Sequence, residues 1–181
     1  MSLERSFAEL TARLQRIKDA LTEVRITVEE DRPRNGQPAI ADQLENTILE
    51  LYGYAHEALE YGGAACKAVG DPFEFNRARQ FLGKSQEAFH RVERRYFSEL
   101  VSHARLSELE RFARKGGRDW QGWTESVKLG LDRCRESIEA ASLAFIHCWE
   151  DVTEVLVIVL TFQEPKPTPP PEPRSDIAKA G

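Results

Sequence analysis

The chain has 181 residues, of which 41% are aliphatic, aromatic or cysteine and 30% are charged, a composition typical of one mostly helical domain with a substantial core. Its net charge of −5 argues against general coating of nucleic acid as the main activity. The sequence contains neither an apolar run of membrane-spanning length nor the continuous apolar stretch of a secretion signal, so we expect a cytoplasmic protein.

Residues 3–28 carry apolar side chains at alternating steps of four and three, which predicts an amphipathic helix. Its buried stripe comprises Leu3, Phe7, Leu10, Leu14, Ile17, Leu21, Val24 and Val28. Two prolines and an Asn-Gly pair in residues 31–38 predict a turn, and Pro38 suits the first position of a second helix.

The second helix is predicted over residues 38–69, with small side chains in its later stripe at Ala58, Gly62 and Ala65. Small residues allow two helix backbones to approach closely, so we expect the tightest helix contact here, and the Gly62-Gly63 pair is a point at which the helix can bend or fray. Residues 70–72, Gly-Asp-Pro, have the sequence of a helix end followed by a new helix start.

A third helix is predicted over residues 72–114 and a fourth over about residues 120–162, separated by a reversal at residues 115–119. Each would be roughly 65 Å long, against roughly 45 Å for the first two. A straight third helix would therefore leave residues 103–131 as an overhanging hairpin tip. In the alternative, a capping box at Ser107 to Glu110 breaks the helix near residues 104–107 and returns its last turns to the core.

Four such stripes joined by short loops predict an all-α fold, an antiparallel up-down-up-down four-helix bundle with a long hairpin between helices three and four. We expect this bundle domain to occupy residues 1–164. Residues 165–181 hold six of the nine prolines and predict a disordered, extended tail. The tail contains Pro-x-x-Pro spacings without the usual basic flanks, which favours a stiff spacer over a docking motif.

Charge is distributed unevenly along the chain. Residues 71–118 carry eleven basic and seven acidic side chains, whereas the chain as a whole is acidic. Acidic faces of neighbouring helices are natural counter-charges for this basic strip, so a compensated surface is favoured over a nucleic-acid site.

Motifs for catalysis or metal binding are not found in the sequence. One Glu-x-x-His pair, Glu87 and His90, lacks the second copy that a diiron bundle needs. Arg95 and His103 are too far apart for the Arg-His pairing of helical ribonucleases. The cysteines Cys66, Cys134 and Cys148 are neither clustered for zinc nor paired for disulfides. We therefore expect no enzymatic activity, cofactor or metal.

The leading hypothesis is a non-enzymatic interaction protein, an adaptor or scaffold that binds a protein partner or forms a homodimer. Residues 155–160 are apolar on all sides of the fourth helix, more than one neighbour covers. A second hypothesis is binding of nucleic acid or membrane headgroups through the basic, aromatic tip, and a third is a helical nuclease or metal-binding bundle. The expected contact residues are Arg111, Phe112, Arg114, Lys115, Arg118, Trp120, Trp123, Val157 and Leu160.

Overall fold

The computed structural model describes residues 2–33, 39–162 and 168–172. Within these ranges the chain forms four α-helices and no strand: α1 (Leu3–Glu30), α2 (Ala39–Val69), α3 (Phe75–Arg95) and α4 (His103–Phe162). A short 3-10 turn, Pro72–Glu74, precedes α3, and a π-helical turn, Tyr96–Leu100, follows it. The all-α class and the four helices are confirmed. Pro38 and the predicted domain boundary after residue 164 lie outside the described residues.

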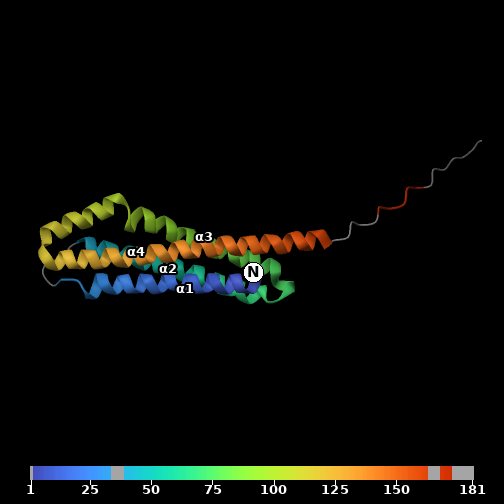
Figure 1. Cartoon of the computed structure of the whole chain (residues 1–181), viewed down its shortest axis with the longest axis horizontal. Helices are drawn as coiled ribbons and strands as arrows, with labels where there is room; N and C mark the ends of the chain where they lie inside the picture. The colour runs from blue at the N-terminus through green and yellow to red at the C-terminus, as the bar shows by residue number, and fades with distance from the viewer. Residues whose placement is uncertain (1, 34–38, 163–167, 173–181) are drawn as a thin grey trace, which may run out of the picture.

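The four helices lie side by side along one long axis (Figure 1). Ser6, near the start of α1, donates a hydrogen bond to Asp151 of α4, and Glu23, near the end of α1, forms an ion pair with Arg133. These two contacts show that α1 and α4 run in opposite directions. α2 lies between α1 and α3, whereas α3 touches α4 at few points.

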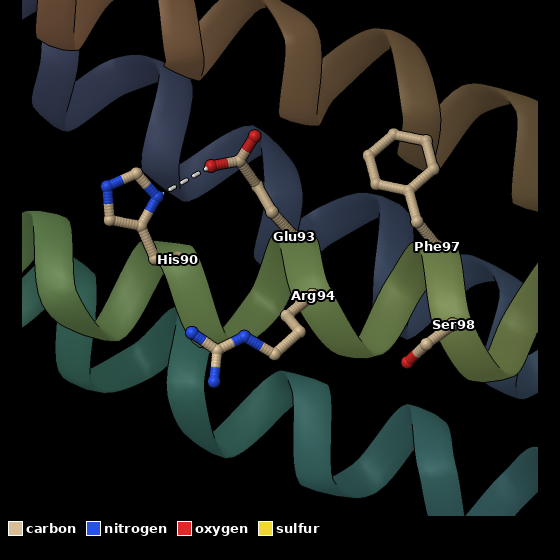
Figure 2. Close-up of a pocket in the computed structure, with 5 residues that line it drawn as sticks. All are labelled: His90, Glu93, Arg94, Phe97 and Ser98. Atoms are coloured by element: carbon tan, nitrogen blue, oxygen red, sulfur yellow. Dashed lines mark hydrogen bonds and ion pairs between the residues drawn. The ribbon is translucent and has the colours of Figure 1, made fainter.

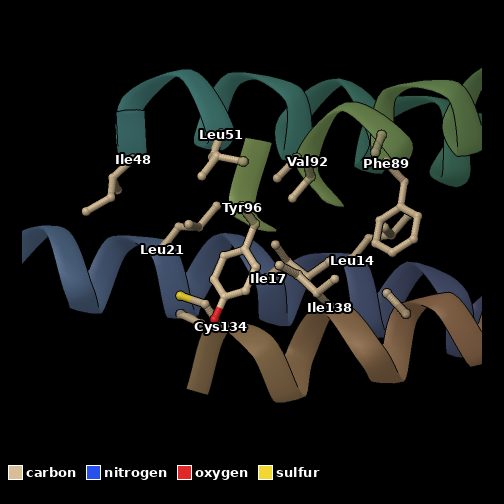
Figure 3. Close-up of a cluster of buried hydrophobic side chains, with 14 of the residues drawn as sticks. Leu14, Ile17, Leu21, Ile48, Leu51, Phe89, Val92, Tyr96, Cys134 and Ile138 are labelled. Carbon is tan, nitrogen blue, oxygen red and sulfur yellow. The ribbon is translucent and has the colours of Figure 1, made fainter. Parts of the chain in front are cut away.

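The predicted apolar stripes meet in one continuous core (Figure 3). All four helices contribute to it, and Phe89 of α3 packs against Phe145 of α4 with ring centroids 5.0 Å apart. Tyr96 lies on the π-helical turn and is fully buried, and its hydroxyl donates a 2.6 Å hydrogen bond to the carbonyl of Leu131. That bond satisfies the one polar atom of an otherwise apolar side chain, so Tyr96 links the end of α3 to α4.

Small residues bring helices close together at two places. A Cβ on Gly62 would lie 3.0 Å from Cδ1 of Leu14 and 3.3 Å from Oγ of Ser85, as the sequence predicts for this stretch. A Cβ on Gly130 would lie only 2.8 Å from Cγ2 of Val24, so α1 and α4 also approach closely, which was not predicted. α2 continues as one helix through Gly62 and Gly63.

The third predicted helix is not straight. It ends in the π-helical turn, and the helix is interrupted at residues 101–102 before α4 begins. Ser102 caps the new helix, because its Oγ accepts a hydrogen bond of 3.2 Å from the amide of Arg105. The Arg105 guanidinium donates to the carbonyl of Glu99 and to the side chain of Gln43, which holds the broken ends together. The straight overhang is therefore wrong, and the break precedes the predicted position by a few residues.

The predicted reversal at residues 115–119 is present at Gly117, inside the span of α4. Gly117 has φ of 81° and ψ of −171°, a conformation essentially restricted to glycine. α4 therefore consists of a short arm before Gly117 and a long arm after it, and the long arm returns along the molecule (Figure 1).

Candidate interaction surfaces

The C-terminal end of α4 projects beyond the other helices (Figure 1). Its apolar stripe is buried as far as Val152, half-buried at Val155 and Leu156, and exposed from residue 157 onward. The stripe loses its cover because α1, the helix that packs against it, begins at Leu3. We call residues 157–162 the α4 ridge.

The α4 ridge exposes large apolar side chains on several sides. Val157 is 57% exposed, Leu160 65% and Phe162 80%. The eight residues 155–162 contain no charged side chain. An apolar helix end without charges or a covering neighbour is what a site of protein association presents.

An apolar groove lies beside the α4 ridge and has a volume of about 430 Å³. Helix α4 forms one wall through Val155, Leu156 and Val159, and the turn between α2 and α3 forms the other. Phe73 stands on this turn and is 97% exposed. We call this hollow the end groove, and its remaining lining includes Leu3, Val69, Pro72, Phe75 and Asn76.

The hairpin tip, residues 103–131, is less open than the sequence suggests. Phe112, Trp120 and Trp123 pack edge to face, with ring centroids 4.8 to 6.4 Å apart. Trp120 is 5% exposed and Trp123 3%, and Leu109 is fully buried. The break after α3 turns the short arm of α4 onto the long arm, and this is why the aromatic side chains cover one another. Contact of Trp120 and Trp123 with a partner stays a prediction, and it would require this cluster to open.

Basic side chains surround the aromatic cluster of the tip. Arg111, Arg114, Lys115 and Arg118 are all exposed, and no salt bridge joins them to another residue that the structure describes. Arg114 adds to the larger effect of Lys128 in lowering the pKa of the Glu110 carboxyl, so it is partly engaged within the chain. None of the four breaks a salt bridge within the described ranges when it meets an anionic partner.

The basic strip on α3 is neutralised in large part. Arg91 forms an ion pair with Glu57 at 3.6 Å, and Arg95 is paired with both Glu50 and Glu99. These acidic partners raise the pKa of Arg95 further above its usual value. The strip therefore contributes to the contact between α2 and α3, as its acidic neighbours suggest.

A shallow hollow on α3 is lined by His90, Glu93, Arg94, Phe97 and Ser98 (Figure 2). The ring of His90 pairs with the carboxylate of Glu93 at 3.0 Å, one turn away on the same helix. Ser98 lies at the other end of the hollow, and its side chain leaves the opposite edge of the helix from the His90 ring (Figure 2). This arrangement holds neither a serine activated by a base nor an enclosed substrate site.

The described residues offer neither a cluster of metal ligands nor a membrane-spanning helix. No group of three or more His, Cys, Asp or Glu side chains gathers there as ligands of one ion would. None of the helices in those ranges is long and apolar enough to cross a bilayer.

Phe73 and the end groove were missed by the sequence analysis. Phe73 follows the helix stop at Gly70 and Asp71, where no helical periodicity predicts its orientation. The amide of Phe73 donates to the carboxylate of Asp71 at 2.9 Å, which fixes the turn. The signal available in the sequence was a large aromatic side chain directly after a capping Asp-Pro pair.

Comparisons of the chain with protein-family models, with curated proteins and with solved structures find no match.

Proposed function

We propose that this chain is a non-enzymatic interaction protein, an adaptor or scaffold on an antiparallel up-down-up-down four-helix bundle, which binds a protein through the C-terminal end of α4. The observation that carries this proposal is the uncovered α4 ridge beside the end groove. The opposed contacts of α1 with α4 support the bundle topology.

The cost of leaving this surface in water supports the proposal. Burial of a Val, Leu or Phe side chain is worth about 1.5–3 kcal/mol, so several exposed side chains on one helix end offer a large gain to a partner that covers them. Single exposed apolar residues are ordinary on protein surfaces, but a contiguous group on a projecting helix is not.

The test is a comparative co-purification with tagged wild type and a Val157→Glu/Leu160→Glu variant. We expect wild type to retain defined partners, or untagged copies of itself, at moderate salt, and the variant to lose them. The matched control is Leu143→Glu/Ile146→Glu, since those side chains lie on the same helix with similar exposure but away from the α4 ridge. Equal recovery by wild type and the ridge variant would contradict the proposal.

A second candidate function is binding of nucleic acid or membrane headgroups, and the four exposed basic side chains of the hairpin tip favour it. Such binding should weaken steeply as salt rises, and an Arg111→Glu/Lys115→Glu variant should lose it. If nucleic acid co-purifies and is lost in that variant, the tip is the principal surface and the α4 ridge is not.

A further inference from the structure

We propose that the occupant of the α4 ridge and the end groove is a second copy of this chain, joined end to end about a twofold axis. Each copy would place its α4 ridge against the end groove and Phe73 of the other. This inference rests on the proposed function, since it names the partner of the same surface.

The residues after Phe162 are poorly suited to cover this surface within the same copy. The nineteen residues after Phe162 contain a single large aliphatic side chain, Ile177, among prolines, charges and small residues. The part of that stretch that the structure describes, residues 168–172, is exposed. It lacks the apolar area that would be needed to bury the ridge.

A lipid surface is also a poor match. In the segments that form this end, residues 3–6, 67–77 and 150–156, acidic side chains outnumber the basic ones, Arg5, Lys67 and Arg77. The acidic residues are Glu4, Asp71, Glu74, Glu150, Asp151 and Glu154. The cytoplasmic face of membranes is negatively charged, so a net acidic rim opposes insertion of the ridge.

The exposed area matches what a dimer requires. The ridge and groove leave six large side chains exposed, Phe73, Val157, Ile158, Val159, Leu160 and Phe162. Their exposed fractions correspond to roughly 700 Å² of apolar surface in each copy. Two copies that cover all of this area bury about 1,400 Å², and covering about six-sevenths of it reaches about 1,200 Å², the lower end of the range for specific interfaces.

The shape of this end is also self-complementary, and its centre carries no charge. A projecting ridge and a recess lie next to each other on the same end, so one twofold rotation lets each copy fill the other. The α4 ridge and the end groove lie at the same end of each copy. Both are therefore covered in a twofold dimer, and a third copy has no ridge or groove left to bind. The absence of charge over residues 155–162 means that two identical surfaces meet there without repulsion.

Sedimentation equilibrium of the full chain from about 1 to 100 µM tests the inference. We expect a monomer–dimer equilibrium that Val157→Glu/Leu160→Glu abolishes and that Leu143→Glu/Ile146→Glu leaves unchanged. Phe73→Asp is the sharper variant, because a side chain 97% exposed contributes nothing to folding of the single copy. It should weaken the dimer at least about tenfold. The unfolding transition should stay unchanged at protein concentrations low enough for wild type to be monomeric, because association itself stabilises the folded chain at higher ones.

A wild type that stays monomeric throughout this range would overturn the inference, as would a dimer insensitive to Phe73→Asp. The proposed function would be contradicted by different results. Suppose that wild type is monomeric and co-purifies with another protein, and that the ridge variant loses that protein. The α4 ridge then binds a different partner, so the proposed function stands and only the dimer is wrong. If the ridge variant changes neither measurement, both proposals fail.

Discussion

Gly117 determines the course of the chain at the hairpin tip. Its backbone, at φ of 81°, lies in a region that side chains with a Cβ avoid, so the two arms of α4 can meet at this angle only through glycine. The neighbouring residues are fully helical in their own arms, which places the whole reversal on one residue.

We expect Gly117→Ala to destabilise the protein by about 1–3 kcal/mol, the cost of a strained backbone conformation at a residue other than glycine. Gly122→Ala is the matched control. Gly122 is helical and a Cβ there would meet no atom within 4 Å, so alanine should stabilise by about 0.5–1 kcal/mol. Urea unfolding measures both changes. Equal effects of the two substitutions would show that the reversal does not depend on Gly117.

The thiols of Cys134 and Cys148 are kept protonated by the core. Burial, with smaller contributions from Glu23 and Asp151 respectively, raises the pKa of each thiol to about 12. The thiol of Cys148 also donates to the carbonyl of Ser6 at 3.3 Å. Since thiolates are the reactive form, both groups should be inert in the folded chain.

Labelling with a thiol reagent at pH 8 should therefore modify the half-buried Cys66 first and reach Cys134 and Cys148 only on unfolding. The same shift predicts a pH dependence of stability. Unfolded thiols ionise near pH 9 while folded ones do not, so the contribution of both groups is full below pH 9 and is lost as pH rises towards 12. Rapid labelling of all three thiols in the native protein would contradict this account.

At the scale of helices, the stripes of apolar residues predict α1 and α2 almost to the residue, because each helix has one buried face and clear end signals. The break after α3 was harder to locate, because apolar residues such as Leu106 and Leu109 continue the helical spacing across it. The capping-box spacing at Ser107 is the stronger sequence signal, yet the residue that caps the helix is Ser102. Arg105, three residues later, also binds Gln43 of α2 and so connects the interrupted helix to α2. That connection depends on side chains far apart in the sequence.

The close approach of α1, α2 and α3 at Gly62 gives a prediction for adjacent glycines. Gly62→Ala should destabilise by about 1 kcal/mol, because its Cβ would press on the buried side chains of Leu14 and Ser85, and Ser85 is held by a 2.6 Å hydrogen bond to the carbonyl of Ala58. Gly63→Ala should instead stabilise by about 0.5–1 kcal/mol, since a Cβ there meets nothing within 4 Å. Thermal unfolding of the two variants checks the sign, and a stabilised Gly62→Ala would show that the helices can separate without cost.

At the scale of the whole molecule, the two ends differ. Aromatic side chains close the hairpin tip, where Leu129 is the large apolar side chain that stays exposed among the charges, whereas the other end leaves the α4 ridge and the end groove uncovered. The sequence predicts Val157 and Leu160 as contact residues, because a run of consecutive apolar residues in a helix can be recognised without knowledge of the tertiary structure. It leaves open whether Trp120 and Trp123 face a partner or cover the apolar stripe and the hairpin turn, since the choice depends on the direction of the break after α3. It also could not place Phe73 beside α4.

Hydrogen–deuterium exchange along α4, at dilute and concentrated protein, tests most directly which end is the contact surface. We predict that amides of residues 153–162 exchange quickly in the dilute sample and become protected on association, because a covered helix end no longer frays. Amides of residues 103–131 should not change. Protection that appears at the hairpin tip, with the α4 ridge unchanged, would contradict the account.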